Sequence, residues 1–306
     1  MHKQIAQSIE AVGKILLGKE EQIKLALTCL FSKGHLLIED LPGMGKTTLA
    51  QALAKVVRLN YNRIQFTSDL LPADILGVSI YDNDTGKFSF HPGPIFSQFI
   101  LADEINRTTP KSQSALLEAM EEHQVTVEGQ TRALPAPFFV IATQNPATHA
   151  GTFPLPESQL DRFMMRIELG YPDALAERTL LEGEDRRAML TQVSACLGPE
   201  DLVEIQSRTS DVKVSEALLD YLQRLVQHTR QAPEYAYGLS PRGTLALLNC
   251  AKTWAYMDGR SHVIPEDIQA VLPSVIEHRL RESADYSGHG GTALAQRLLS
   301  TIDVVG

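Results

Sequence analysis

The sequence lacks the features that define several classes of protein. It has three cysteines, and Cys29, Cys196 and Cys250 are too scattered to predict a disulfide framework or a zinc site. No apolar run reaches the roughly 18 residues that a membrane-spanning helix needs. The N-terminal segment carries scattered charges and has no secretory signal pattern. We therefore expect a cytoplasmic protein without a membrane span.

Basic charge is also scarce. The net charge is −9, with 15 Lys and Arg against 18 Asp and Glu in residues 1–172, and 13 against 19 in residues 173–306. Neither part has the basic excess that a nucleic-acid-binding surface requires, so no nucleic-acid partner is expected. Hydrophobic residues make up 43% of the chain, enough for a sizeable core.

Short apolar segments alternate with helix-like stretches in the first part of the chain. Nearly continuous apolar strands are typical of a parallel sheet covered by helices on both faces, built from right-handed βαβ units. The expected strands are His35–Glu39, Arg63–Thr67, Phe99–Asp103, Phe138–Thr143 and Met165–Leu169. Between them, Gly77–His91 has two alternating runs around turn residues, which predicts a protruding β-hairpin.

The strand pattern stops after Tyr171–Pro172. Glu216–Thr229 has its apolar residues on one helical face, with Ser215 as a predicted N-cap. Ser240–Pro241 predicts the start of another helix, and Pro265 of a third. The chain is therefore expected to have an α/β domain at residues 1–172 and an all-α domain at residues 173–306.

The strongest motif follows the first predicted strand, in LLIEDLPGMGKTT. Gly45-Lys46-Thr47 matches the end of the phosphate-loop pattern G-x-x-x-x-G-K-[ST], although Asp40 stands where the pattern has its first glycine. Pro42 and Gly43 still allow a tight turn. Backbone N–H groups of the loop would bind phosphate at a helix N-terminus. The loop residues that would form this nest are Pro42, Gly43, Met44, Gly45, Lys46, Thr47 and Thr48.

Within this motif, Lys46 would reach the β- and γ-phosphates of ATP, and the Thr47 hydroxyl would bind Mg²⁺. The alternative is an ordinary glycine turn that carries a surface lysine. The strand before the loop and the helix after it favour the phosphate site.

Two carboxylates end the strand FILADE. A buried strand delivers Asp103 and Glu104 to the sheet edge where α/β proteins bind ligands. Asp103 would hold Mg²⁺ through water, and Glu104 would orient and deprotonate the attacking water. Adjacent acids at a strand end also occur without a function, so the prediction depends on the neighbouring phosphate loop.

Three further polar residues are candidates for catalysis. Asn145 ends the strand FFVIATQN and could bind the water or the γ-phosphate, or could simply cap its strand. Arg162 precedes the last strand, and Arg242 lies in the first turn of a helix in the second domain. An arginine that reaches the γ-phosphate can accelerate transfer by about 10³- to 10⁵-fold. Arginines at helix ends are otherwise solvated or paired with acids.

Taken in order, these segments resemble the AAA+ ATPases, and specifically the MoxR family. The resemblance covers about residues 12–284. It is carried by Gly18-Lys19-Glu20, LPGMGKT, HPGPIF, LADEINR, SALLEAMEE, FFVIATQNP, LPESQLDRFMMR and LSPRGTLALL. It implies an αβα sandwich with strand order 5-1-4-3-2, a helical lid and a ring that is usually hexameric.

The resemblance also implies roles for individual residues. Lys46 and Thr47 match Walker A, and Asp103 and Glu104 match Walker B. Asn145 matches sensor 1, Arg162 the arginine finger supplied to a neighbouring subunit, and Arg242 sensor 2, which can act within a subunit or across the interface. Gly18 begins the adenine pocket, and the 77–91 hairpin is an insert in helix 2 that faces the ring pore.

The family resemblance implies an ATP-driven, chaperone-like remodeller of proteins. Its characteristic task is maturation of a client enzyme, including metal or cofactor insertion, often with a partner that carries a von Willebrand factor A domain. One alternative is a nucleic-acid motor or loader, which the acidic balance disfavours. Another is a nucleotide switch with little turnover, which Glu104 and Arg162 disfavour.

Overall fold

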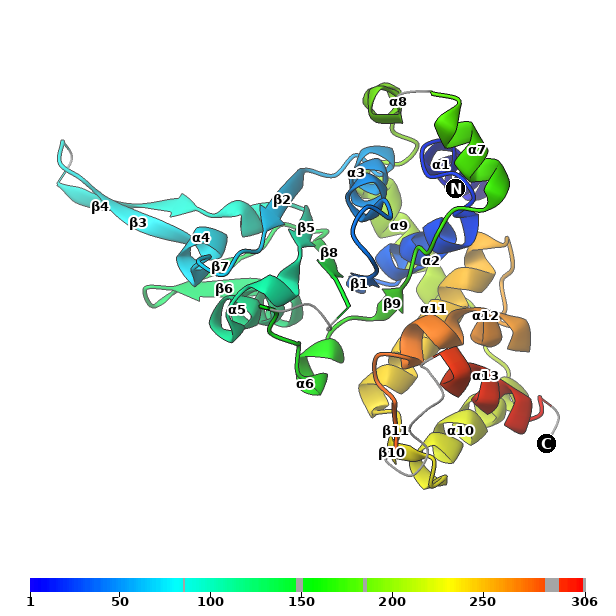
Figure 1. The fold of residues 1–306 in the computed structure, drawn as a ribbon. Helices are drawn as coiled ribbons and strands as arrows, with labels where there is room; N and C mark the ends of the chain where they lie inside the picture. The colour runs from blue at the N-terminus through cyan, green and yellow to red at the C-terminus, as the bar shows by residue number, and fades with distance from the viewer. Residues whose placement is uncertain (85, 147–150, 184–185, 284–291, 305–306) are drawn as a thin grey trace.

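A parallel five-stranded sheet lies at the centre of the first part of the chain (Figure 1). The structure is a computed structural model that describes residues 1–84, 86–146, 151–183, 186–283 and 292–304. In spatial order the strands are β9 (Met165–Ile167), β1 (Leu36–Glu39), β8 (Phe139–Gln144), β5 (Phe99–Asp103) and β2 (Tyr61–Gln65). Counted along the chain within this sheet, that order is 5-1-4-3-2, as predicted, and every neighbouring pair is parallel.

Helices cover both faces of this sheet. The helical elements of the first part are α1 (His2–Gly13), α2 (Glu20–Phe31), α3 (Lys46–Val56), α4 (Pro72–Leu76), η1 (Pro94–Phe96), η2 (Ile105–Arg107), α5 (Pro110–Glu122) and α6 (Glu157–Leu160). Successive strand residues enter opposite cores, as the pleat requires. Leu36 and Ile38 join the core beneath α1, α2 and α3, whereas Leu37 joins the core beneath α5. The two cores confirm the αβα layering.

Two β-hairpins lie outside the central sheet. The predicted hairpin is β3 (Gly77–Asp82) paired with β4 (Lys87–Pro92), and it projects far from the body (Figure 1). The sequence analysis did not predict the second, β6 (Gln124–Val127) paired with β7 (Gln130–Ala133). Its turn residues Glu128 and Gly129 both have positive φ, 53° and 76°. That conformation matches a tight two-residue hairpin turn.

The rest of the chain is mainly helical. Its helices are α7 (Ala174–Leu181), α8 (Arg186–Gln192), α9 (Pro199–Ser210), α10 (Glu216–Gln231), α11 (Pro241–Met257), α12 (Pro265–Ile276) and α13 (Thr292–Thr301). Ser215 and Ser240 cap α10 and α11 by accepting hydrogen bonds from Leu218 N and Gly243 N, as predicted. One short antiparallel pair was not predicted from the sequence: β10 (Tyr235–Tyr237) with β11 (Arg281–Glu282).

The helical part is joined to the sheet by a continuous core. Buried side chains of α9, α10, α11 and α12 belong to the same cluster as α2 and the adjoining face of the sheet. Across the described ranges, no helix has both the length and the apolar character needed to cross a bilayer.

Candidate active site

The carboxyl ends of β1, β5 and β8 meet at one edge of the sheet, and the loop after β1 forms a turn suited to phosphate. Gly43 and Gly45 adopt φ of 88° and 93°, a conformation that side chains with a Cβ rarely take. An added Cβ on Gly43 would meet no atom within 4 Å, so the loop is open on that side. Gly45 is the N-cap of α3, which directs the helix N-terminus at the loop.

Lys46 begins α3 and is 8% exposed. Its ammonium group donates to Asp40 O at 2.5 Å and to Asn145 Oδ1 at 2.9 Å. Burial lowers the pKa of Lys46, while the nearby carboxylates of Asp40, Asp103 and Glu104 act against that shift. The nearby carboxylates thus favour the charged form of this lysine.

Asp103 is the buried end of β5, with 6% exposure. Its Oδ1 accepts from Thr143 Oγ1 at 2.6 Å, and its Oδ2 accepts from Arg63 Nη2 at 2.5 Å. Thr143 Oγ1 also accepts from the Glu104 backbone N–H at 2.9 Å. The hydroxyl of the neighbouring strand therefore fixes both acidic residues at once.

Glu104 is held by three side chains from three different elements. Its backbone is left-handed, with φ of 58°, which is uncommon outside glycine and tends to occur at functional sites. Glu104 Oε2 accepts from Gln65 Nε2 at 3.1 Å and from Arg107 Nη1 at 3.0 Å, and Oε1 accepts from Asn145 Nδ2 at 3.2 Å. These three contacts fix the position of the Glu104 side chain beside the phosphate loop.

The remaining predicted nucleotide residues surround this edge. Pro42 is exposed, and Met44, Thr47 and Thr48 are half-buried in the loop and first turn of α3. Gly18 lies beside Asp173, the N-cap of α7, where an added Cβ would sit 3.0 Å from Asp173 Oδ2; two residues earlier, Leu16 lies 2.8 Å from where a Cβ on Gly45 would be.

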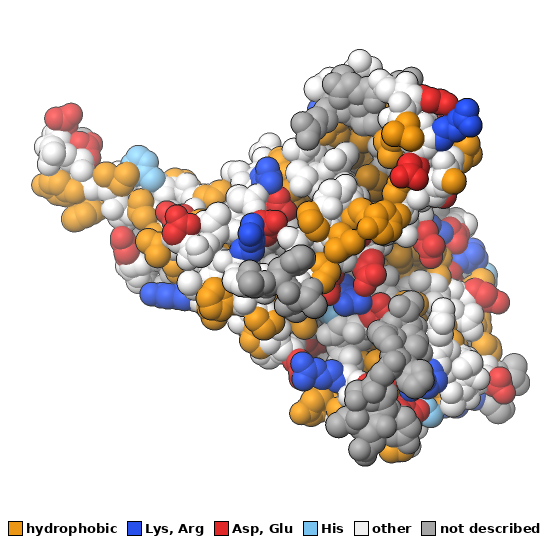
Figure 2. All heavy atoms as spheres, in the orientation of Figure 1, with side chains coloured by type: hydrophobic (Ala, Val, Ile, Leu, Met, Phe, Trp, Pro, Cys, Tyr) orange, Lys and Arg blue, Asp and Glu red, His pale blue; other side chains and the backbone are white. Residues whose placement is uncertain are grey.

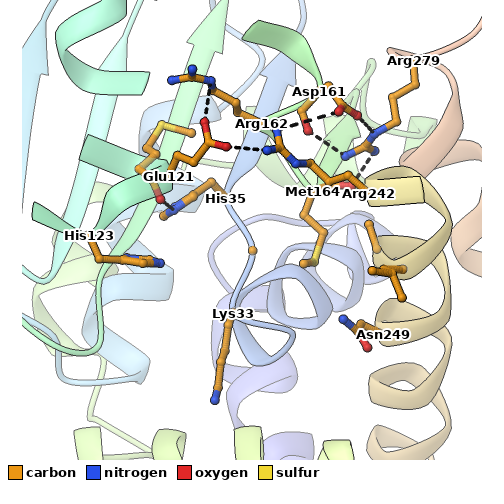
Figure 3. A pocket seen from close by; sticks show the side chains of 14 residues that line it. Lys33, His35, Glu121, His123, Asp161, Arg162, Met164, Arg242, Asn249 and Arg279 are labelled. Carbon is orange, nitrogen blue, oxygen red and sulfur yellow. Dashed lines mark hydrogen bonds and ion pairs between the residues drawn. The ribbon is translucent and has the colours of Figure 1, made fainter. Parts of the chain in front are cut away.

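Arg162 and Arg242 form a second cluster (Figure 3). Glu121, at the end of α5, lies between them: Arg162 Nε is 3.2 Å from Glu121 Oε2, and Arg242 Nη2 donates to Glu121 Oε1. Arg242 Nη1 also lies 3.9 Å from Asp161 Oδ2. These side chains line a cavity of about 500 Å³.

Arg279 supports this second cluster through Asp161 (Figure 3). Its side chain is 4% exposed, and Nε lies 2.7 Å from Asp161 Oδ1. It also donates to the carbonyls of Met164 at 3.0 Å and Phe163 at 2.6 Å. Burial lowers the pKa of Arg279, and the contact with Asp161 opposes that shift. Arg279 therefore orders the segment that carries Arg162.

The two clusters lie at opposite ends of the strands of the same sheet: the Lys46 cluster lies at the carboxyl ends, and the Arg162 cluster lies at the amino ends. The cavity is lined by His35, immediately before β1, whereas the phosphate loop begins at Asp40, immediately after it. Arg162 likewise precedes β9, whose Met165 pairs with Leu36 at the start of β1. Five residues of extended strand span roughly 16 Å. The structure therefore groups Lys46 with the acids and Asn145, and groups Arg162 with Arg242 elsewhere.

Sequence reasoning missed several members of both clusters. Gln65 ends β2 beside Asp103, so the rule that selected Asp103 and Asn145 could have found it. Arg63 lies two residues earlier on the same face. Glu121 and Arg279 had no sequence signal, because tertiary packing brings Glu121 of α5 to Arg162 and Arg279, after α12, to the adjacent Asp161.

Chemically, the carboxyl edge combines a phosphate-binding turn, a lysine and a fixed carboxylate, which suits hydrolysis of a nucleoside triphosphate. Thr47 and Asp103 are oxygen donors of the kind that Mg²⁺ prefers. Within the described residues, no cluster of His, Cys, Asp and Glu could hold a metal through protein ligands alone. His123 takes the left-handed position that ends α5.

Comparison with known proteins agrees with this geometry. Residues 35–165 match the ATPase family associated with various cellular activities (AAA), and residues 227–298 match the AAA lid domain. The chain is 40% identical to the chaperone MoxR1 of Mycobacterium tuberculosis, covering 90% of this chain and 75% of that protein. It is 42% identical to the uncharacterized protein YeaC of Bacillus subtilis, covering 99% and 96%. A crystal structure from Cytophaga hutchinsonii superposes with a TM-score of 0.90 at 39% identity, covering 99% and 95%.

Proposed function

The chain belongs to the MoxR family of AAA+ ATPases, and from that premise we propose that it hydrolyses ATP as a ring and uses the energy to remodel client proteins. The observation that carries the proposal is the separation of two incomplete half-sites. Lys46 and Glu104 lie at the carboxyl edge of the sheet, and Arg162 and Arg242 lie at its amino edge. Such half-sites become complete where one subunit meets the next.

In this proposal the carboxyl edge binds the nucleotide and activates water. Lys46 turns from Asp40 O and Asn145 Oδ1 to the β- and γ-phosphates, and Glu104 accepts the proton of the attacking water. Mg²⁺, held by Thr47 and through water by Asp103, would supply charge neutralisation at the phosphates. Gly18 borders the adenine, and Asn145 orients the water beside Glu104.

The amino edge serves the neighbouring subunit. Arg162 and Arg242 share Glu121, so both arginines face the same cavity and both act across the interface in a homo-hexamer. Glu121 neutralises them until a neighbour's γ-phosphate is present. Arg242 therefore reaches the nucleotide in trans, together with the arginine finger.

The β3–β4 hairpin is the proposed contact with clients, facing the ring pore. Apolar side chains gather along it (Figure 2), and Tyr81 and Phe88 are 51% and 73% exposed, with ring centroids 5.2 Å apart. Exposed apolar groups of this kind suit unfolded polypeptide. The client would be an enzyme that needs maturation or metal or cofactor insertion, with a von Willebrand factor A domain protein as partner.

The chain would divide into its two domains between residues 172 and 173, and the ring would work in the cytoplasm.

The test follows ATP turnover over a range of protein concentrations, with sedimentation velocity on the same samples. Specific activity should rise as rings form, and an unfolded protein should stimulate turnover whereas DNA should not. Activity that is constant down to the monomer would contradict the ring. Stimulation by DNA would favour a nucleic-acid motor, and assembly with negligible turnover would favour a switch.

The hairpin needs its own variant in the same assay. Phe88→Ser should abolish stimulation by unfolded protein and leave basal turnover unchanged, because its ring lies on the projecting hairpin, away from the phosphate loop. Lys87→Ser, on the adjacent exposed position, is the matched control. Equal stimulation in both variants would remove the hairpin from client contact.

A further inference from the structure

Asp40 occupies the position at which the phosphate-loop pattern has its first glycine. Its carboxylate accepts three backbone hydrogen bonds. Oδ2 accepts from Leu169 N at 2.8 Å and from Gly170 N at 2.7 Å, and Oδ1 accepts from Leu41 N at 2.7 Å. These three N–H groups fix the Asp40 side chain between the start of the phosphate loop and the segment after β9.

The backbone of Asp40 faces the nucleotide side. Its carbonyl accepts from Lys46 Nζ at 2.5 Å, and its N–H donates to Gln144 O at the end of β8. One residue therefore contacts the phosphate-binding lysine through its main chain and the end of β9 through its side chain. When Lys46 moves to phosphate, the Asp40 carbonyl loses a charged partner.

The segment that Asp40 holds leads directly into the helical part. The next residue along, Tyr171, is held by Lys19, whose buried ammonium group donates to Tyr171 O at 2.6 Å. Asp173 then caps α7 by accepting from Ala176 N at 2.7 Å. Three consecutive residues, 169–171, are thus bound by the side chains of Asp40 and Lys19.

A second contact links β1 and β9 to the helical part. Arg166 in β9 lies 3.2 Å from Glu39, the residue before Asp40, and 3.4 Å from Glu277 at the end of α12. A movement of the C-terminal end of β1 relative to β9 would therefore also reach α12, through the contacts of Arg166 with Glu39 and Glu277.

We propose that Asp40 is a positioning residue that couples occupancy of the phosphate loop to the Leu169–Gly170 segment, and through it to the helical lid. The inference rests on nucleotide binding at Lys46 in the proposed function. It predicts that glycine, the residue that the phosphate-loop pattern specifies, impairs this chain, because glycine supplies no acceptor for the two N–H groups. Asparagine keeps one acceptor oxygen and should preserve the coupling.

The experiment compares wild type, Asp40→Gly and Asp40→Asn with and without a non-hydrolysable ATP analogue. Amide hydrogen exchange at Leu169 and Gly170 measures the proposed bonds directly. Fluorescence of Trp254, the only tryptophan in the sequence, reports the lid, because Lys24 of α2 lies 3.8 Å from the centre of its ring in α11. Analogue affinity and kcat are measured on the same preparations.

In wild type, the analogue should change both amide exchange and Trp254 emission. Asp40→Gly should bind the analogue within about threefold of wild type. Its two amides should exchange at least about tenfold faster, and it should lose both nucleotide-dependent changes and about tenfold in kcat. Asp40→Asn, which keeps the acceptor for Leu169 N and Gly170 N and loses only the one for Leu41 N, should retain both nucleotide-dependent changes.

Each contrary result has its own meaning. Wild type that does not bind the analogue refutes the proposed function rather than the coupling. Wild type that binds it without changing these amides, or Asp40→Gly that keeps the changes and its kcat, overturns the coupling. Weak binding by Asp40→Gly would make Asp40 a loop-folding residue instead. Should the glycine variant not fold, a folded Asp40→Asn that has lost the changes still overturns the proposal.

Discussion

Lys46 Nζ donates a 2.9 Å hydrogen bond to Asn145 Oδ1, although the two residues lie 99 positions apart in the sequence. Asn145 in turn donates to Glu104 at 3.2 Å, so the lysine, the amide and the carboxylate form one continuous chain of contacts. The buried ammonium group is therefore held beside the loop before nucleotide binds, and phosphate oxygens would replace its neutral acceptors. Such preorganisation limits the cost of binding.

Lys46→Ala should weaken ATP affinity by roughly 10- to 100-fold, the range expected for losing a charge-assisted hydrogen bond. Calorimetry with ATP and Mg²⁺ measures the change. Lys55→Ala is the control, because Lys55 is an exposed lysine of the same helix that donates to Leu190 O at 2.8 Å. Equal ATP affinity in the two variants would remove the phosphate role from Lys46.

Glu104→Gln should bind ATP and Mg²⁺ normally but hydrolyse ATP about 10²- to 10⁴-fold more slowly, since an amide cannot accept the water's proton. Its shape can still satisfy several of the contacts that Gln65, Arg107 and Asn145 make with Glu104. Asp103→Asn should instead raise the Mg²⁺ concentration required for turnover. Titrating Mg²⁺ against both variants separates the roles, and identical profiles would show that the assignment is wrong.

The sequence predicted the carboxyl edge well because that edge follows from strand ends. Asp103 ends one strand and Asn145 follows another, while Lys46 begins the helix after the loop that leaves a third, and parallel strands bring such positions together. The amino edge could not be predicted in the same way. Glu121 and Arg279 reach Arg162 only after α5 and the segment after α12 pack around it. Asp40 was visible as a departure from a motif, but its partners depend on where β9 ends.

The buried imidazole of His35 makes the free energy of unfolding depend on pH. The ring is buried, its Nδ1 accepts from Val140 N at 3.0 Å, and its Nε2 lies 3.2 Å from Met120 O, so the neutral Nε2–H form satisfies both contacts. Burial lowers the pKa of His35 to about 4, against an ordinary value of 6.5. The unfolded chain therefore binds more protons between these values. This contribution is complete above pH 6.5 and is lost as pH falls toward 4.

Urea unfolding should show the loss as about 2 kcal/mol between pH 7.5 and pH 5 from His35. His278, whose pKa burial also lowers, adds a change of the same sign. His35→Gln should be less stable at pH 7.5 yet lose less stability on acidification, whereas His91→Gln, at an exposed position, should follow wild type. Parallel pH profiles for wild type and His35→Gln would contradict the assignment.

Arg162 is expected to act on the nucleotide bound by the neighbouring subunit. Its side chain contacts Glu121 at the amino edge of the sheet, and Lys46 lies at the opposite edge of the same chain. Arg162→Ala should therefore bind ATP normally and lose most turnover, in the range of about 10³-fold for a missing arginine finger. Arg208→Ala, on the exposed face of α9, is the matched control and should keep full turnover.

Mixed rings decide between action in trans and action within one chain. Arg162→Ala retains an intact phosphate loop, and Lys46→Ala retains an intact finger, so an interface between them holds one complete site. Mixing the two inactive variants should restore part of the wild-type turnover, once size-exclusion chromatography has established that both enter the same rings. A site completed within one chain cannot recover in this way, because every subunit lacks one of its two parts. Mixed rings that form and remain inactive would therefore make Arg162 an interface arginine, with no part in the chemistry of its neighbour.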